Sequence, residues 1–390
     1  MIRVGFQLNF KDRGWMGGIN YFRNLFEALR FSDYNTVEPV IVAGSSADKS
    51  ILSSFGATRT NFSSLGDTTG WKWKMRRALA LGIGRDFIFE RQLKAERIEL
   101  ISHFGYLGKR ASIPSLVWIT DFQEKYFPEF FSVSELDARN RENRNVVRHA
   151  SAILLSSEHA REGLAQISAE AAARAYVLPF VASVPDMSDI PKIGLLVAKY
   201  SLPDKYFFLP NQFWKHKNHE VVIRALGLLK RSGKPVTVVA TGNLQDHRQP
   251  EHANYLLRLI ATEDISEYFR ILGMVSYPNL MGLMANAVAV LNPSLFEGWS
   301  TTVEESKSLG KLAIVSDISV HREQLPSRGV FFHPSDAAGL ADALLEALRA
   351  HQKDIETVYM QEAREKFLVR RSDFANRYQE IAHSVIGGSK

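Results

Sequence analysis

The chain has 390 residues, no cysteine and a net charge of +6, and 45% of its residues are hydrophobic. This profile is typical of a folded globular protein with room for two domains. The absence of cysteine excludes disulfides, zinc fingers, iron–sulfur clusters and thiol nucleophiles. The positive charge is compatible with an anionic ligand, although solubility explains it as well.

Short apolar runs rich in Val, Ile and Phe alternate with helical patterns along the first half of the chain. The runs cover residues 2–9, 39–43, 100–103, 115–120 and 152–156. The segments between them leave room for crossover helices. The alternation therefore predicts βαβ units and a mainly parallel sheet.

A second series of such runs follows a segment that holds Pro185 and Pro191. Its runs cover residues 206–210, 235–241, 269–273, 287–292, 311–316 and 330–333. We interpret residues 181–191 as a linker between an N-terminal domain, residues 1–180, and a second domain, residues 192–371. The predicted fold class is α/β, with two Rossmann-like doubly wound domains facing a cleft. In such sheets, ligands bind beyond the carboxyl ends of the strands.

The loop after the run 287–292 carries the strongest chemical signal. Thr301 and Glu304 have the spacing of a capping box that opens a helix, which places Glu297 in the loop and Glu305 in the first helical turn. Both carboxylates can then face one pocket, and carboxylates accept hydrogen bonds from the paired hydroxyls of a sugar. The alternative, that Glu304 and Glu305 only complement the helix dipole, leaves the loop before them unexplained.

Glu297 and Glu305 have seven residues between them. In this spacing and loop they resemble the glutamate pair of the retaining glycosyltransferases of family 4, which have the GT-B fold. The resemblance implies that Glu305 holds the ribose hydroxyls of a nucleotide and that Glu297 contacts the transferred sugar. It also implies a final helix over residues 372–390 that returns to the N-terminal domain. The neighbouring residues implied in donor binding are Gly298, Trp299, Ser300 and Thr301.

A second segment, residues 209–219, follows the first strand of the second domain. Lys217, in this segment, is the candidate cation that would stabilise negative charge on a departing diphosphate. The segment is similar to the family's phosphate-binding loop, in which an Arg commonly precedes the Lys by five residues. Gln212 occupies that position here, so Lys215 or another residue would have to complete the pair of cations. The alternative is that these lysines are only solvent-exposed basic residues at the start of a helix. This alternative is stronger for Lys215 than for Lys217.

Weaker signals follow other strands. Gly17 and Gly18 allow a close backbone approach to a phosphate or sugar, although a flexible turn explains them as well. Gly242 ends one strand and Met274 follows another, which in similar proteins borders the base. His321 belongs to a segment that matches a family pattern ending in His-x-Glu. Neither a Gly-x-Gly-x-x-Gly fingerprint nor a Walker A loop occurs, which argues against NAD enzymes and P-loop kinases.

The acceptor side is less well defined. Thr120 and Glu124 stand where a His is expected from the family pattern. Asp121 is the first choice for a catalytic residue that contacts the acceptor, and His103 the second. A lone His at a strand end is otherwise more often a structural hydrogen-bonding group.

Residues 71–97 interleave basic side chains with Trp and Phe at helical spacing. This pattern is compatible with an anionic membrane surface. An ordinary amphipathic surface helix explains it too. Nucleic acid is not expected, since no recognisable nucleic-acid module accompanies the pattern.

Taken together, the sequence predicts a retaining hexosyltransferase that uses a UDP- or GDP-linked sugar and a glycan or lipid-linked glycan acceptor, in bacterial surface glycan assembly. No cofactor or metal is expected, because Lys217 and helix termini can neutralise the diphosphate. No signal peptide and no apolar run of spanning length is present, so we expect a cytoplasmic protein, peripheral at the inner face of the plasma membrane if residues 71–97 bind there. A nucleotide-sugar epimerase, a phosphorylase and a non-catalytic carbohydrate- or membrane-binding subunit are the alternatives.

Overall fold

The computed structural model describes residues 1–390 except residues 12–15, 57–58, 186–188, 247 and 389–390. The chain divides into two compact units. The first comprises Met1–Pro128, Ser132–Val181 and Val369–Lys390, and the second comprises Glu129–Phe131 and Ala182–Leu368. The predicted linker, residues 181–191, begins at this boundary, and its residues 186–188 lie outside the described part of the chain.

The first unit is built on a parallel sheet of seven strands in the order β3-β2-β1-β4-β5-β6-β7. The strands are β1 (Ile2–Gln7), β2 (Val37–Ala43), β3 (Arg59–Phe62), β4 (Leu100–His103), β5 (Ser115–Trp118), β6 (Ala152–Leu155) and β7 (Tyr176–Val177). The helices between them are α1 (Met16–Arg30), α2 (Lys49–Ser53), α3 (Gly70–Gly82), α4 (Phe87–Ala95), α5 (Gln123–Tyr126), the short η1 (Pro128–Phe130), α6 (Val133–His149), α7 (Glu158–Ala165) and α8 (Ala169–Arg174). The order reverses between β1 and β4, as in doubly wound folds.

The second unit repeats this plan with six parallel strands in the order β10-β9-β8-β11-β12-β13. The strands are β8 (Phe207–Leu209), β9 (Val238–Ala240), β10 (Phe269–Ile271), β11 (Val290–Asn292), β12 (Ala313–Ser316) and β13 (Gly329–Phe332). The helices are α9 (Ile193–Tyr200), η3 (Lys215–Lys217), α10 (His219–Arg231), α11 (His252–Thr262), α12 (Tyr277–Asn286), α13 (Thr301–Ser308), α14 (Ser319–Gln324), α15 (Ala337–Ala350) and α16 (Lys353–Gly387). Here the order reverses between β8 and β11.

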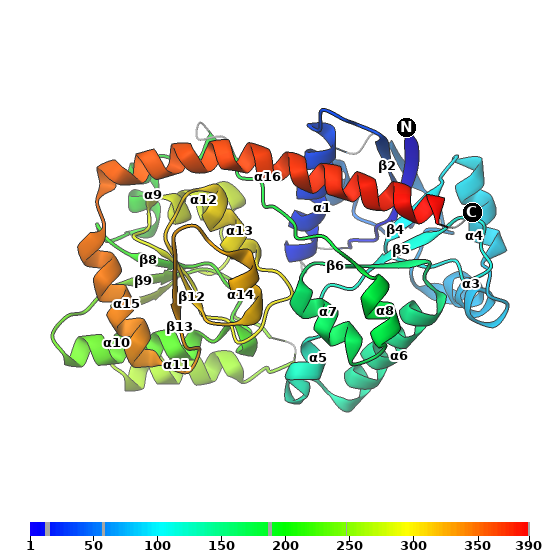
Figure 1. Ribbon diagram of the computed structural model, residues 1–390. Coiled ribbons are helices and arrows are strands. Elements are labelled where there is room, and N and C mark those ends of the chain that lie inside the picture. Colours follow the sequence, from blue (N-terminus) through cyan, green and yellow to red (C-terminus); the bar gives the residue numbers. More distant parts are fainter. Residues whose placement is uncertain (12–15, 57–58, 186–188, 247, 389–390) are drawn as a thin grey trace. The chain divides into compact units, whose positions relative to one another are not determined.

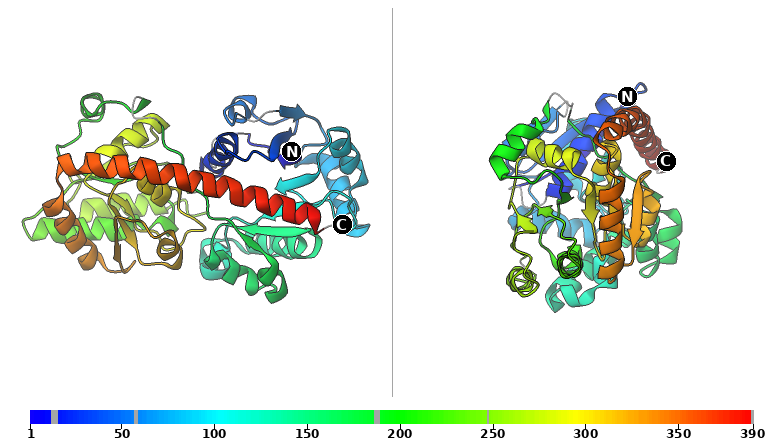
Figure 2. Two further views of the ribbon diagram at one scale, coloured as in Figure 1. Left: turned by 45° about the horizontal axis from the view of Figure 1, so that its top comes forward. Right: turned by 90° about the vertical axis from the view of Figure 1, so that its left-hand side faces the viewer.

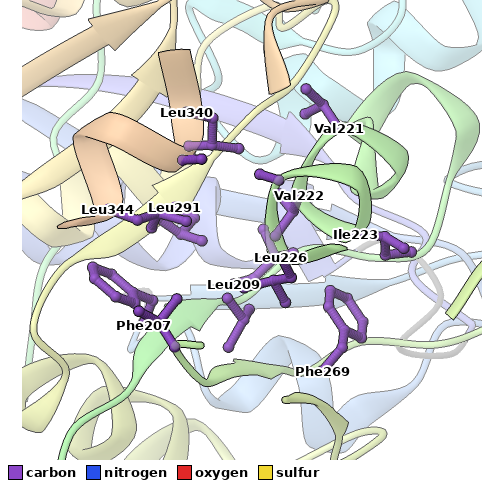
Figure 3. Close-up of a cluster of buried hydrophobic side chains, with 14 of the residues drawn as sticks. Phe207, Leu209, Val221, Val222, Ile223, Leu226, Phe269, Leu291, Leu340 and Leu344 are labelled. Carbon is purple, nitrogen blue, oxygen red and sulfur yellow. The ribbon is translucent and has the colours of Figure 1, made fainter. Parts of the chain in front are cut away.

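Alternating side chains of the strands explain why helices cover both faces of the second sheet (Figures 1 and 2). Phe207 and Leu209 point to one face, where they pack with α10, α11 and α15 (Figure 3). Phe208, between them, packs on the other face with α9 and α12. A strand that is apolar on both faces is typical of a parallel sheet buried between helices. The α/β fold class with two parallel sheets is therefore confirmed.

The last helix, α16, begins at Lys353 and not near residue 372 as expected. No Pro or Gly occurs between residues 353 and 386, so the sequence offers no point at which the helix would stop earlier. The part of α16 from Val369 onward belongs to the first unit. There Tyr378 is fully buried, and its hydroxyl donates a hydrogen bond to Ser102 Oγ at 2.9 Å.

Candidate functional site

Two loops meet at the point where the strand order of the second unit reverses. One follows β8 and contains η3, and the other follows β11 and leads into α13. They are joined by a hydrogen bond from the Leu295 amide to the His216 carbonyl oxygen at 2.8 Å, and by Asn218, whose side chain donates to the Pro293 carbonyl oxygen at 3.0 Å. Because β8 and β11 are parallel neighbours, topology alone brings these loops together.

An ion pair connects the two loops. Lys217 Nζ lies 2.6 Å from Glu297 Oε1, and both side chains are largely buried. Ser294 Oγ donates a second hydrogen bond to the same carboxylate oxygen at 2.7 Å. Burial favours the neutral form of Glu297, but the attraction of Lys217 and His321 and the two hydrogen bonds outweigh it and lower the pKa of this carboxyl. Glu297 is therefore ionised and paired with Lys217.

The second predicted glutamate, Glu305, has the opposite electrostatic environment. It is buried, and burial raises its pKa to about 8, although the hydroxyl of Tyr277 opposes the rise. The same hydroxyl donates to the Ser183 carbonyl oxygen at 3.0 Å, which fixes it beside α13. Glu305 is thus a buried carboxyl that is largely protonated near neutral pH. Hydroxyl groups of a ligand could supply the hydrogen bonds that stabilise its charged form.

The start of α13 differs from the predicted capping box. Ser300 is the N-cap, because its backbone is extended and its hydroxyl accepts the Val303 N–H at 3.3 Å. Thr301 is consequently the first helical residue and Glu305 the fifth, one position further along the helix than expected. Glu304 does not close a box: its carboxylate accepts hydrogen bonds from Lys307 at 2.9 Å and from Gln324 at 3.1 Å.

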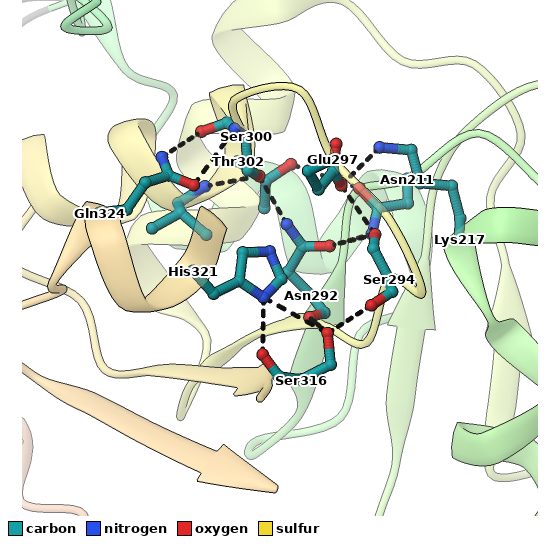
Figure 4. A network of polar contacts seen from close by, with 11 residues as sticks. Asn211, Lys217, Asn292, Ser294, Glu297, Ser300, Thr302, Ser316, His321 and Gln324 are labelled. Carbon is teal, nitrogen blue, oxygen red and sulfur yellow. Dashed lines mark hydrogen bonds and ion pairs between the residues drawn. The ribbon is translucent and has the colours of Figure 1, made fainter. Parts of the chain in front are cut away.

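A network of buried amides and hydroxyls surrounds Glu297, and the sequence interpretation missed most of it (Figure 4). Asn292 accepts from Asn211 at 3.1 Å and donates to Ser300 Oγ at 2.5 Å. The fully buried His321 is hydrogen-bonded through Nδ1 to the Ser316 carbonyl oxygen at 2.8 Å, and its pKa is lowered by burial despite the attraction of Glu297. Asn211, Asn292 and Ser316 each end or follow a strand, and that position is the sequence signal that could have identified them.

Three of the predicted donor-binding residues come together at the ends of β8, β9 and β10. Gln212 accepts a hydrogen bond from the Asn243 amide at 2.7 Å, and its side-chain nitrogen lies 3.9 Å from Met274 Sδ. Gly242 has φ +139°, and a Cβ there would lie 2.4 Å from the Asn211 carbonyl oxygen, so only glycine fits. Met274 is 60% exposed, which leaves an apolar surface available at this rim.

The other predicted residues of the second unit take different positions. Lys215 is exposed at the start of η3, whereas Lys217 at its end is held against Glu297. Gly298 and Trp299 are half-buried in the loop before α13. The structure therefore joins Lys217 to Glu297 and does not single out Lys215 as the second cation.

In the first unit, Gly17 and Gly18 lie in the first turn of α1, with Gly17 exposed and Gly18 buried. Asp121 is only partly buried. Its carboxylate accepts from the Gln123 amide at 3.1 Å and lies 3.4 Å from Arg139, so it fixes the start of α5. Glu124, where the family pattern suggests a His, is buried and bonded to Asn143 at 2.9 Å.

His103, the second choice for the acceptor side, has the environment of a structural residue. It is fully buried, Nε2 is hydrogen-bonded to the Tyr21 hydroxyl at 2.6 Å, and Nδ1 to Ser102 Oγ at 2.8 Å. Burial lowers its pKa to about 3, so it is neutral. This environment fits the structural alternative better than a catalytic role.

Two absences concern the described residues. Within these residues no group of three or more His, Asp or Glu side chains is arranged to hold a metal ion. No helix in the same part of the chain is both long and apolar enough to cross a membrane. Metal independence remains a prediction.

Comparison with known proteins places this site in a family. Residues 198–366, which contain both loops, match the family model described as glycosyl transferases group 1. The matched residues all lie in the second unit. The sequence is 24% identical over 180 residues to the O-antigen chain mannosyltransferase RfbU of Salmonella typhimurium, and this similarity covers 46% of each protein, so the chain spans about half the length of that relative.

Solved structures extend the similarity to the whole fold of the chain. The Anabaena protein HepE, solved in complex with UDP, has 16% identity and a TM-score of 0.68, and the alignment covers 99% of both chains. Sucrose-phosphate synthase of Thermosynechococcus elongatus has 13% identity and a TM-score of 0.67 over 100% of both chains. At these identities the likeness shows the fold, which is that of the GT-B glycosyltransferases.

Proposed function

We propose that the chain transfers a hexosyl unit from a nucleoside diphosphate sugar to a hydroxyl acceptor, with retention at the anomeric carbon and without a metal. One observation carries this proposal: the Lys217–Glu297 ion pair joins two loops at the switch point of the second sheet, where the strand order reverses, and the buried Glu305 lies in the helix that follows one of these loops. The two carboxyls have opposite pKa shifts, which suits two different ligand contacts. The HepE structures contain UDP and UDP-glucose, which supports a UDP-linked donor here.

The ion pair gives Lys217 and Glu297 linked roles in this proposal. A diphosphate brings negative charge to the loop after β8, and Lys217 turns from Glu297 to neutralise it. Glu297 then accepts hydrogen bonds from hydroxyls of the transferred sugar, and Ser294 and the positive charge of Lys217 keep it ionised. Donor binding thus exchanges one buried ion pair for two charge-assisted contacts, which offsets the cost of separating the pair.

Glu305 holds the nucleoside in the same proposal. Two vicinal hydroxyls of a ribose can donate to its two oxygens, and this stabilises the ionised carboxylate that burial otherwise disfavours. Binding of the nucleoside therefore lowers the pKa of Glu305 and releases a proton where the free protein holds one. Gln212 and Met274 form the rim where the base would lie.

The chemical step is a displacement at the anomeric carbon. The bond from this carbon to the phosphate oxygen breaks, and its electron pair stays on the diphosphate, where Lys217 stabilises the charge. The acceptor oxygen bonds to the anomeric carbon on the same face, and its proton passes to a phosphate oxygen. Asp121 is proposed to contact the acceptor, because it is the partly exposed carboxylate at the start of α5.

The proposal also includes the acceptor and the location of the enzyme. A surface glycan or its lipid-linked precursor is supported by the similarity to an O-antigen mannosyltransferase. Such an acceptor would place a cytoplasmic enzyme at the inner face of the plasma membrane.

Thermal unfolding with UDP-, GDP- and ADP-sugars tests the donor part. A ligand present at 100 times its dissociation constant adds about 2.7 kcal/mol to the free energy of unfolding. We expect one nucleotide class to stabilise the protein. We also expect the nucleoside diphosphate to be released when an acceptor is added. If none of these sugars stabilises the protein, the proposal is contradicted. Interconversion of the sugar without transfer indicates an epimerase.

A further inference from the structure

Ser300 is the residue at which the loop that carries Glu297 becomes the helix that carries Glu305. It is the N-cap of α13 and lies between the two glutamates in the chain. Its hydroxyl accepts hydrogen bonds from the Val303 amide at 3.3 Å and from Asn292 Nδ2 at 2.5 Å. A shift of Ser300 is therefore passed on to both glutamates.

Gln324, the last residue of α14, is hydrogen-bonded to the backbone of Ser300 on both sides (Figure 4). Its Oε1 accepts from the Ser300 amide at 3.2 Å, and its Nε2 donates to the Ser300 carbonyl oxygen at 3.0 Å. Nε2 also donates to Glu304 Oε1 at 3.1 Å. The buried carboxamide can pair with a peptide group in this way because it offers a donor and an acceptor. These bonds fix Ser300 independently of its own hydroxyl.

The backbone at Gln324 is itself held in place. Lys307 Nζ donates to the Gln324 carbonyl oxygen at 2.7 Å and to Glu304 Oε1 at 2.9 Å. The next residue, Leu325, has φ +40° and ψ 64°, a left-handed conformation that is costly for a residue with a side chain. Leu325 is 73% exposed, so burial of its side chain does not offset this cost. Backbone strain of this kind persists where the surrounding structure fixes it, and it clusters at functional sites.

Helix α14 turns two buried polar side chains toward the site. His321 and Gln324 have i, i+3 spacing, so they lie on the same face of the helix. The attraction of His321 contributes to the lowered pKa of Glu297, and Gln324 contacts Ser300. One short helix therefore acts on the first glutamate and on the N-cap of the helix that carries the second.

We propose that Gln324 is a positioning residue of the donor site. It acts through the backbone of Ser300 and holds Glu297 and Glu305 in the geometry that the donor requires. The inference rests on the proposed function, because it takes these two glutamates as the donor contacts. Catalytic geometry is sensitive to small displacements, since a misplacement of about 1 Å can cost a factor of about 100 in rate. Loss of the hydrogen bonds of Gln324 therefore reduces both donor affinity and transfer.

The variant Gln324→Met tests the proposal, because methionine fills a similar volume and cannot form these hydrogen bonds. We expect it to bind the nucleotide sugar that stabilises the wild type about tenfold less tightly. At saturating donor it should also release the nucleoside diphosphate about tenfold more slowly when an acceptor is present. Urea unfolding of the same variant measures the accompanying loss of stability.

Gln379→Met is the matched control. Gln379, in the first unit, is also buried, and its side chain is hydrogen-bonded to the Thr36 amide at 2.6 Å, the Thr36 hydroxyl at 3.0 Å and the Ser32 hydroxyl at 3.2 Å. Urea unfolding should show a similar loss of stability in the two methionine variants, because each loses three hydrogen bonds of a buried amide. Donor binding and transfer by Gln379→Met should nevertheless stay within about twofold of the wild type.

Gln324→Asn is the second variant and decides the question if Gln324→Met does not fold. It keeps the amide but is one methylene shorter, so donor affinity should fall by a smaller factor, about threefold. Unchanged donor binding and transfer in the Gln324 variants would overturn the inference. Equal losses of function in Gln324→Met and Gln379→Met would overturn it too, because the effect would then follow stability alone. If the wild type itself binds no UDP-, GDP- or ADP-sugar, the proposed function is contradicted and this inference falls with it.

Discussion

The two switch points of the molecule have the same strand topology, but their side chains differ in character. They are aromatic in the first unit and polar in the second. In the first unit, β4 ends at His103, which is enclosed by the rings of Tyr21, Phe22, Trp118 and Tyr378. In the second unit, β11 ends at Asn292, which is held by amides and hydroxyls and leads to an ion pair. Strand order places a loop at the carboxyl edge of a sheet, where ligands bind in such folds. The side chains at the strand end decide whether a ligand can be bound there.

This contrast predicts that variants at the second switch point affect catalysis, and variants at the first affect stability. The largest effect is expected for Lys217→Ala. Loss of the cation on the leaving diphosphate should lower the transfer rate about 100- to 1,000-fold. The rate at which the nucleoside diphosphate is released measures the transfer rate. Lys215→Ala, two residues away and exposed, is the matched control and should stay within a few-fold of wild type.

Lys217→Ala also leaves Glu297 buried without its cation, so stability must be measured beside activity. The double variant Lys217→Ala, Glu297→Gln removes both charges and should recover much of the lost stability without recovering transfer. Recovery of transfer in the double variant would show that Lys217 acts only by neutralising Glu297.

The next largest effect concerns pH and Glu305. With a pKa of about 8 in the free protein against an ordinary 4.5, the folded protein holds a proton that the unfolded chain releases. The free energy of unfolding should therefore fall as pH rises from about 4.5 to about 8. If the nucleoside requires the ionised carboxylate, donor affinity should rise up to about 50-fold from pH 6 to pH 8. Titration calorimetry on wild type and Glu305→Gln measures this, and an equal pH dependence of both proteins would contradict it.

A smaller effect is expected in the first unit from Tyr21→Phe. The variant removes the hydroxyl that is bonded to His103 Nε2 at 2.6 Å and leaves a buried nitrogen without that partner. Urea unfolding should show a loss of about 1–3 kcal/mol. Stabilisation by a nucleotide sugar should not change. A loss of transfer without a loss of stability would instead return His103 to the catalytic residues.

The smallest effect is expected for Ser294→Ala. Without its hydroxyl, Glu297 loses a hydrogen bond of 2.7 Å, so the pKa of this carboxyl should rise. The acid limb of the rate–pH profile should move to higher pH, with a rate reduction of only a few-fold at neutral pH. An unchanged acid limb would mean that Lys217 alone keeps Glu297 ionised.

Some of this arrangement could be predicted from the sequence, and the limits have physical causes. The alternation of apolar runs predicted both sheets, because buried parallel strands must be apolar on both faces. The cap of α13 was assigned to Thr301 instead of Ser300, because either hydroxyl can accept an N–H of the first turn and only the backbone geometry decides. The start of α16 was missed because nothing in the sequence separates its first part from its last.

The electrostatics of the site depend on contacts between distant segments. The pKa of Glu305 depends on burial and on Tyr277, whose hydroxyl is fixed by the backbone of Ser183. The pairing of Lys217 with Glu297 joins residues 80 positions apart. Spacing along the chain suggested each glutamate, but it carried no information on which of them would be ionised.

The central claim is that Glu305 binds the nucleoside and Glu297 serves the transferred sugar. Thermal unfolding with the stabilising nucleotide sugar, combined with a transfer assay, tests it most directly on wild type, Glu297→Gln and Glu305→Ala. We predict that Glu297→Gln keeps the ligand-induced stabilisation and loses transfer, whereas Glu305→Ala loses the stabilisation itself. Full stabilisation of Glu305→Ala together with wild-type transfer by Glu297→Gln would contradict the claim.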